Sequence, residues 1–278
     1  MNRMTLTRRF CCMALVASAL PTQAFAGAQL APHRAFYVLE ASRLDNKGGI
    51  SAIAGKLAYE ITGNDCEGYA VNYRIVNRYV QGEGVPQTMD IQLTSFESGD
   101  GLGLDMKQKQ FVNASLQSES RVKAKKPGDG SKGAGELEGK ESKSFDIDGA
   151  AIFPTAFQKK LMNDAEKGET RSSSLVYEGS DDEKASRAIS FIGAKKPGST
   201  ISTGADATTL QALNKLPYWP VTVSYYVVDA EGDDQPTYSA SFNMLENGVS
   251  TDLVLDYGSY ALKGKLEKIE LLKPDTCK

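Results

Sequence analysis

The strongest constraint on the fold of this chain is an alternation of apolar and polar residues with a period of two. In "SAIAGKLAYEIT" (51–62), the larger apolar side chains occupy odd-numbered positions: Ile53, Leu57, Tyr59 and Ile61. The same alternation returns at 69–79, 89–93, 219–227, 238–244 and 253–257. Such segments form strands with one buried and one solvated face, usually joined antiparallel through short turns. The sequence therefore predicts a mainly β protein.

The last apolar segment changes parity partway along its length. Tyr260 and Leu262 are even-numbered, whereas Ile269 and Leu271 are odd-numbered. One extra residue in a strand turns every later side chain to the other face, so we predict a bulge or bend near Gly264. Bent strands of this kind favour a large antiparallel sheet that curls on itself.

Two segments have the pattern of short helices. Residues 155–168 place Thr155 and Gln158 at the spacing of a capping box, and Gly168 supplies a C-terminal stop. A weaker helix is predicted to begin at Asp206 and to end before Pro217. We expect both helices to cover apolar surface at the mouth or an edge of the sheet.

The segment at about 118–146 is polar and rich in glycine and lysine. It is consistent either with edge strands around a loose tip at 127–135 or with a disordered loop, and we favour the strands. We expect it to be a partly mobile part of one domain that comprises residues 27–278.

The N-terminus has the organisation of an export signal. A basic segment without acidic residues precedes a short apolar run, and "AFA" fits signal cleavage after Ala26. The apolar run is too short to span a bilayer. We therefore expect residues 1–26 to be removed and the mature protein to be periplasmic and not lipidated. Arg8 and Arg9 leave both the general and the twin-arginine export route open.

Cleavage also changes the charge of the chain. Loss of Arg3, Arg8 and Arg9 reduces the 32 basic residues to 29, which face 35 acidic residues. An acidic balance of this size argues against nucleic acid or an anionic membrane surface as a partner.

The cysteines indicate a single disulfide. Cys11 and Cys12 leave with the signal, so Cys66 and Cys277 remain. In an oxidising compartment two cysteines most simply form one structural bond, and a redox role is disfavoured because no Cys-x-x-Cys spacing is present. We expect this bond to pin the terminal strand at an open edge of the curled sheet.

The sequence contains little that indicates catalysis or a cofactor. His33 is the one histidine, which excludes multi-histidine metal sites, and we expect it to begin a strand and to bond locally. Ser120 and Lys123 have the Ser-x-x-Lys spacing, but on a strand they would face opposite ways. We therefore expect no enzyme active site, metal or cofactor, although a hydrolase that uses paired carboxylates stays open.

Two ligand-loop patterns are incomplete. The glycine-rich "GAGELEGKES" lacks the first glycine and the Ser or Thr of a phosphate-binding loop. Asp229, Glu231 and Asp233 resemble the opening of a calcium loop, but the required glycine and final glutamate are absent. We interpret the first as a solvated tip and the second as a hairpin turn.

Several longer segments carry a resemblance to a known family. "LAPHRAFYVLEAS", "CEGYAVNYRIV" and "SFNMLENGVSTDLVLDYGSYALKGKLEKIEL" resemble the cell envelope integrity protein EipB family of alphaproteobacteria. The resemblance implies a periplasmic protein folded as an open, overlapping, spiral-like β-barrel with helices near its mouth, similar to lipoprotein carriers. It also implies a disulfide between Cys66 and Cys277, a partner with tetratricopeptide repeats, and no established catalytic residue.

Two functions are consistent with these observations. The first is a non-enzymatic periplasmic protein that maintains envelope integrity by binding an envelope protein. The alternative is a carrier that shelters a lipid or lipoprotein acyl chain, for which the apolar inner strand faces and the two helices argue.

Overall fold

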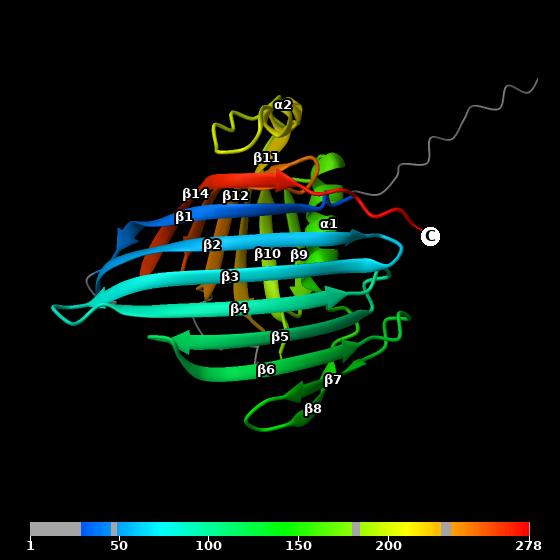
Figure 1. Cartoon of the computed structure of the whole chain (residues 1–278). Helices are drawn as coiled ribbons and strands as arrows, with labels where there is room; N and C mark the ends of the chain where they lie inside the picture. The colour runs from blue at the N-terminus through cyan, green and yellow to red at the C-terminus, as the bar shows by residue number, and fades with distance from the viewer. Residues whose placement is uncertain (1–28, 46–48, 180–183, 229–234, 278) are drawn as a thin grey trace, which may run out of the picture.

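A single antiparallel sheet dominates the computed structural model, which describes residues 29–45, 49–179, 184–228 and 235–277 (Figure 1). Two features predicted from the sequence lie outside the described residues: the export signal and the hairpin turn that contains Asp229, Glu231 and Asp233. Among the described residues, neither helix is long and apolar enough to cross a membrane.

The sheet has fourteen strands in the described part of the chain. The first eight are β1 His33–Leu44, β2 Ile50–Asn64, β3 Gly68–Gln81, β4 Gln87–Glu97, β5 Gly103–Val112, β6 Ser115–Lys125, β7 Gly133–Glu138 and β8 Lys143–Ile147. The other six are β9 Arg171–Val176, β10 Ser186–Ile192, β11 Tyr218–Val227, β12 Tyr238–Leu245, β13 Ser250–Asp256 and β14 Tyr260–Leu271. A turn at 246–248 joins β12 to β13.

The strand order brings the two ends of the chain together in the middle of the sheet. Strands β1 to β8 follow one another outward, the chain crosses through the helix α1 to β9 at the opposite end, and β9 to β14 return. Strand β14 then pairs with β1 along most of its length (Figure 1). The prediction that the terminal strand lies at an open edge is therefore wrong, because β14 has a hydrogen-bonded neighbour on each side.

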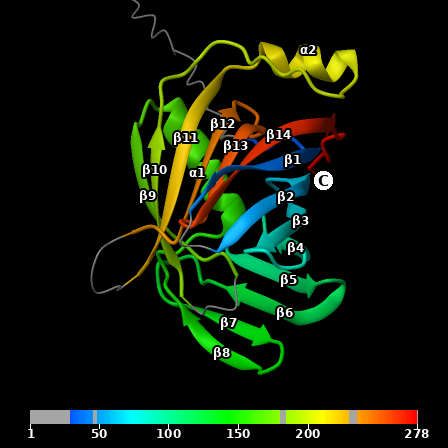
Figure 2. The ribbon, with the colours of Figure 1, turned by 90° about the vertical axis from the view of Figure 1, so that its left-hand side faces the viewer.

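The sheet curls until its two ends approach without pairing, as the prediction of an open, overlapping barrel requires (Figure 2). The end strands β8 and β9 are not neighbours in the hydrogen-bonded order. Instead the Ile152 amide donates to the Leu175 carbonyl (2.8 Å), and the Tyr177 amide donates to the Ile152 carbonyl (3.0 Å). The Tyr177 ring also packs against Phe145 and Phe153. Side chains and one short bridge thus join the ends.

The parity change in β14 arises from a bulge, but not at the predicted place. Phe36 of β1 pairs with Lys268 and Tyr37 pairs with Leu266, so Glu267 is the extra residue. Gly264 pairs regularly with Leu39 and Leu253 on its two sides. Its small size is needed there, because a Cβ would lie 3.0 Å from the Leu253 Cβ and 3.1 Å from Leu39 Cδ2. The glycine that suggested a bend instead marks close packing.

The polar segment at 118–146 contains parts of three strands, β6, β7 and β8. The predicted loose tip overlaps β7, which begins at Gly133. A Cβ at Gly135 would lie 2.3 Å from the ring of Phe145 on β8, so this glycine makes room for an aromatic side chain. Glycine within a strand often marks such a close approach.

Both predicted helices are present. The first, α1, is Pro154–Glu166, and Gly168 lies just after it with the expected positive φ of 78°. The second, α2, is Ala207–Lys215, and its cap is Asp206, whose carboxylate accepts the Thr209 amide (2.9 Å). The buried Leu213 of α2 packs among the core residues that surround β1 and β14.

Candidate functional site

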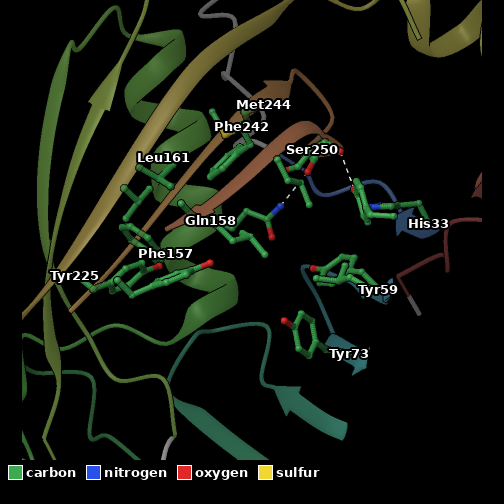
Figure 3. Close-up of a pocket in the computed structure, with 18 residues that line it drawn as sticks. His33, Tyr59, Tyr73, Phe157, Gln158, Leu161, Tyr225, Phe242, Met244 and Ser250 are labelled. Carbon is green, nitrogen blue, oxygen red and sulfur yellow. Dashed lines mark hydrogen bonds between the residues drawn. The ribbon is translucent and has the colours of Figure 1, made fainter. Parts of the chain in front are cut away.

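An apolar cavity of about 270 Å³ lies inside the curled sheet, beside α1 (Figure 3). Its lining comes from both walls of the sheet and from one face of the helix. From the wall of β1, β2 and β3 come His33, Tyr37, Leu57, Tyr59 and Tyr73. From β11, β12 and β13 come Val223, Tyr225, Tyr238, Ala240, Phe242, Met244, Ser250, Leu253 and Leu255. Phe157, Gln158 and Leu161 of α1 and Gly248 complete it.

Strand pairing sets the aromatic residues of this cavity side by side. Tyr59 and Tyr73 are direct cross-strand partners on β2 and β3. Tyr225 and Tyr238 are partners on β11 and β12, with ring centroids 5.9 Å apart. Directly opposed residues share one face of the sheet, so each wall presents a tyrosine pair to the interior.

Three polar side chains of the lining already form hydrogen bonds within the protein. The Tyr37 hydroxyl donates to the Ser250 carbonyl (2.7 Å), and Gln158 Nε2 donates to the Gly248 carbonyl (2.9 Å). His33 begins β1 as predicted, and its Nδ1 lies 2.7 Å from the Ala31 carbonyl. Burial lowers the pKa of His33, so its imidazole is neutral at pH 7.

Four phenols remain available to a ligand. The hydroxyls of Tyr59, Tyr73, Tyr225 and Tyr238 have no hydrogen-bond partner among the described residues. Burial raises the pKa of each of the four phenols, so they are neutral donors and acceptors at physiological pH. An apolar lining with a few polar groups is typical of a non-covalent binding site.

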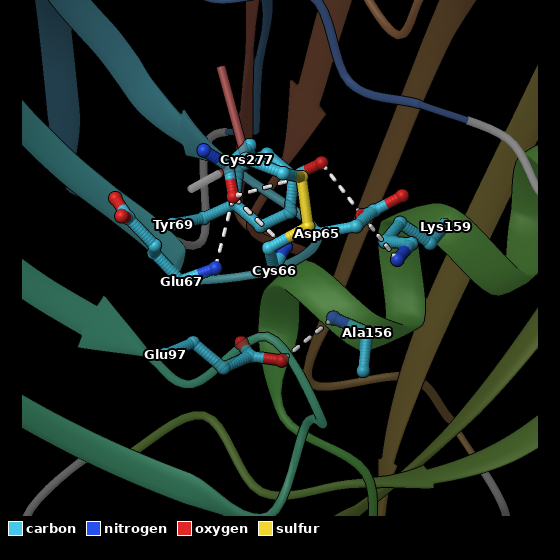
Figure 4. Close-up of polar contacts among 9 residues, drawn as sticks. Asp65, Cys66, Glu67, Tyr69, Glu97, Ala156, Lys159 and Cys277 are labelled. Atoms are coloured by element: carbon cyan, nitrogen blue, oxygen red, sulfur yellow. Dashed lines mark hydrogen bonds and ion pairs between the residues drawn. A yellow bond between two sulfur atoms is a disulfide. The ribbon is translucent and has the colours of Figure 1, made fainter. Parts of the chain in front are cut away.

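The helix that forms part of this cavity is capped by a residue from a distant strand. Glu97, at the end of β4, accepts the backbone amides of Thr155 and Ala156, both at 2.8 Å (Figure 4). The predicted capping box is wrong: Phe153 is the N-cap, it makes no side-chain cap bond, and Thr155 lies within the helix. The lack of a local acceptor indicates that the cap comes from another part of the chain, but it does not indicate which residue supplies it.

Glu97 shares its buried environment with a lysine. Lys126 Nζ donates to the Ala151 carbonyl and lies 5.0 Å from the Phe153 ring centroid. Burial raises the pKa of Glu97, while the two amides of α1 and the charge of Lys126 oppose that rise. Burial likewise lowers the pKa of Lys126, and the charge of Glu97 opposes this. Each charge therefore offsets the desolvation of the other.

The disulfide lies next to another anchor of the same helix. Cys66 and Cys277 are bonded as predicted, with their Cα atoms 5.7 Å apart. The preceding residue, Asp65, accepts from Lys159 Nζ of α1 (2.5 Å) and from the Tyr69 hydroxyl (2.8 Å). The bond therefore joins the C-terminal segment to the β2–β3 turn that contacts α1 (Figure 4).

Other candidate sites considered from the sequence are not assembled. Ser120 and Lys123 face opposite sides of β6, because the buried residues of this strand are even-numbered. Glu97 is the one acidic side chain in the buried part of the described chain, so no buried carboxylate pair is formed there. Across the described residues, no group of three or more histidine, cysteine or acidic side chains could hold a metal ion.

Comparison with known proteins gives a consistent result. The sequence profile of the EipB-like family matches residues 24–273. The Brucella abortus (strain 2308) protein named Cell envelope integrity protein EipB is 33% identical over 244 residues, which cover 87% of this chain and 85% of that protein. A crystal structure described as a beta-barrel-like protein of the domain of unknown function DUF1849, from Brucella abortus, superposes with a TM-score of 0.81 at 31% identity. That alignment covers 88% of this chain and 100% of the other.

Proposed function

Because this chain belongs to the EipB-like family, we propose that it is a non-enzymatic periplasmic protein that helps to maintain the integrity of the cell envelope. Its curated relative is named for that role. A periplasmic location is supported by the export-signal pattern of residues 1–26 and by the disulfide, which suits an oxidising compartment. We further propose that it acts by sheltering an apolar chain in the cavity beside α1.

The observation that carries this proposal is the apolar cavity. Its volume of about 270 Å³ exceeds the cavity of roughly 150 Å³ that binds benzene in an engineered protein, and approaches the lower end of small-molecule pockets, about 300 Å³. Such a space suits one acyl chain segment or one ring system rather than a whole diacyl lipid. Two polar contacts, from Gln158 to Gly248 and from Lys159 to Asp65, hold the helix that forms part of its lining.

We expect the Ala240→Trp variant to lose most of its binding of an apolar probe. Ala240 lines the cavity, so an indole ring at this position would occupy the space. The measurement is the fluorescence of N-phenyl-1-naphthylamine, an uncharged apolar dye, titrated with the purified protein. The parent should bind the dye saturably at one site, and Ala240→Trp should bind it at least about tenfold more weakly.

The matched control is Ala54→Trp, which places the same ring on the exposed outer face of β2. This variant should bind the dye like the parent, and thermal unfolding should show that both variants are folded. Equal binding by Ala240→Trp and the parent, or no saturable binding by the parent, would contradict the use of the cavity.

Binding of a protein partner is the second candidate function. Strand β8 is the last strand of the sheet and pairs only with β7 among the described strands. The other edge of its backbone pairs with no strand among the described residues, and we propose that it accepts a strand or loop from another chain. The resemblance in sequence to the EipB family adds the expectation that the partner contains tetratricopeptide repeats.

A photo-reactive residue in place of the exposed Ser144 on β8 is expected to crosslink one specific envelope protein in intact cells. The same residue in place of Ala54, on the outer face of β2, should not capture that protein. Mass spectrometry of the adduct identifies the partner and any tetratricopeptide repeats. The same adduct at both positions, or none at Ser144, would count against this edge as the docking site.

A further inference from the structure

The imidazole of His33 is fixed in one tautomer where it lines the cavity. Its Nδ1 lies 2.7 Å from the carbonyl oxygen of Ala31, and a carbonyl oxygen can only accept a hydrogen bond. Nδ1 therefore carries the proton. Burial lowers the pKa of this imidazole, so the ring is neutral at pH 7 and its other nitrogen, Nε2, keeps an unprotonated lone pair.

The lone pair of Nε2 borders open space. Nε2 accepts no hydrogen bond from the described residues, although the side chain is deeply buried, with His33 only 3% exposed. Some polar atoms of the described residues are sealed in the interior without a partner, Asn77 Oδ1 among them, but Nε2 is not one of these. The space that His33 lines is the apolar cavity. The wall of this cavity therefore holds one strong hydrogen-bond acceptor that the protein leaves unpaired.

The rest of the lining restricts which groups can pair with this acceptor. It includes no lysine, arginine, aspartate or glutamate, so it offers no opposing charge to an ionic head group. The ring centroid of Tyr59 lies 5.5 Å from that of His33, and the Tyr59 hydroxyl has no partner among the described residues. Both side chains lie on one wall, across the cavity from Phe157 and Tyr225 (Figure 3). A neutral group that both donates and accepts a hydrogen bond matches this wall.

Resting on the proposed function, we propose that the cavity selects an apolar molecule that ends in a neutral hydroxyl group, which donates its proton to Nε2 of His33 while the apolar chain fills the space between the walls. A molecule without a donor, such as an ether, would cover Nε2 and leave a buried acceptor unpaired. A carboxylate would be desolvated without an opposing charge and has no proton to donate. His33 is thus a specificity-determining residue of the site.

Three molecules of similar length test this selectivity: 1-decanol, its isomer 1-methoxynonane, which has no donor, and decanoate. Each is titrated at about pH 8, below its limit of solubility, against the parent protein loaded with N-phenyl-1-naphthylamine. The alcohol should displace the dye at a concentration about tenfold lower than the ether. Decanoate should be the weakest of the three, because it brings a charge into an uncharged lining.

The variant His33→Asn removes Nε2, and its amide nitrogen can take the place of Nδ1 beside the Ala31 carbonyl. The ratio of the two displacement constants, ether over alcohol, should fall from about ten to about one. This ratio does not depend on how tightly a variant binds the dye itself. The matched control is Glu40→Gln, at an exposed position of the same strand, which should keep the ratio of the parent.

Nuclear magnetic resonance of the parent gives a readout that needs no variant. The chain has one histidine, so the two imidazole nitrogen signals of the untagged, ¹⁵N-labelled protein belong to His33. In the free protein at about pH 8, the proton should reside on Nδ1 and not on Nε2. Addition of 1-decanol should move the Nε2 signal in the direction of a nitrogen that accepts a hydrogen bond, and 1-methoxynonane should not.

The possible failures of the two proposals are distinct. Equal displacement by 1-decanol and 1-methoxynonane in the parent, an unchanged ratio in His33→Asn, or a proton on Nε2 in the free protein would overturn the selectivity for a hydroxyl group. Each of these results would leave the cavity proposal intact. Failure of the parent to bind the dye at all would overturn the proposed function as well.

Discussion

The Cys66→Ser variant is expected to lose about 2–5 kcal/mol of unfolding free energy, because the disulfide closes a long loop of the chain. The two cysteines are separated by 211 positions in the sequence. Beyond β14 few other contacts hold the C-terminal segment: the Leu272 amide donates to the Pro32 carbonyl (2.8 Å), and Asn64 Nδ2 donates to the Asp275 carbonyl at 3.4 Å. Without the bond, this segment is free to separate from the β2–β3 turn.

Urea unfolding followed by circular dichroism measures this loss. The Cys66→Ser/Cys277→Ser double variant should match the single variant, and the parent should fall to the same stability when a reductant is present. We expect the affinity for the apolar dye to change much less than the free energy of unfolding, because the disulfide does not line the cavity. An unchanged urea midpoint in Cys66→Ser would show that the bond does not stabilise the fold.

Glu97→Ala is expected to destabilise the protein by about 3 kcal/mol or more and to loosen α1. The change removes the acceptor of two helix amides, at Thr155 and Ala156, and leaves the buried Lys126 without the opposing charge. Because Phe153 supplies no cap, no local side chain can replace the lost carboxylate. The first turn of the helix carries Phe157, which lines the cavity, so dye binding should weaken together with stability.

Two further variants separate the causes of this effect. Glu97→Gln keeps a carbonyl that can accept one of the two amides, so its loss of stability should be intermediate. Glu136→Ala removes an exposed carboxylate and should change the unfolding free energy by less than about 0.5 kcal/mol. If the unfolding free energy of Glu97→Ala differs from that of the parent by no more than this amount, the carboxylate is not the cap on which α1 depends.

The sequence predicted those parts of the fold that arise from neighbouring residues. The alternation at 53–61 and 219–227 identified inward-facing side chains of β2 and β11, because a strand directs successive residues to opposite faces whatever it pairs with. Asp206 was correctly predicted to begin α2, since its carboxylate bonds only three residues ahead. The pairing of Cys66 with Cys277 was predicted because Cys11 and Cys12 are expected to leave with the export signal.

Features that depend on long-range contacts were not predictable in the same way. The capping box at Thr155 was wrong because Glu97, 58 residues away, occupies the helix N-terminus instead. The bulge was misplaced because Gly264 is required for packing between Leu39 and Leu253, which only the assembled strands reveal. The terminal strand was assigned to an edge because nothing in its own residues indicates that β1 is its neighbour.

The sequence by itself determined that this chain is a mainly β protein with two short helices, one pair of cysteines outside the N-terminal segment, and an export-signal pattern within that segment. Only the tertiary structure decided where the sheet begins and ends, which carboxylate caps α1, and that five tyrosines line one apolar cavity. The physical reason is the distance along the chain over which each interaction acts. Side-chain periodicity and local caps act over a few residues, whereas strand order, the bulge and the cavity depend on which distant segments come into contact.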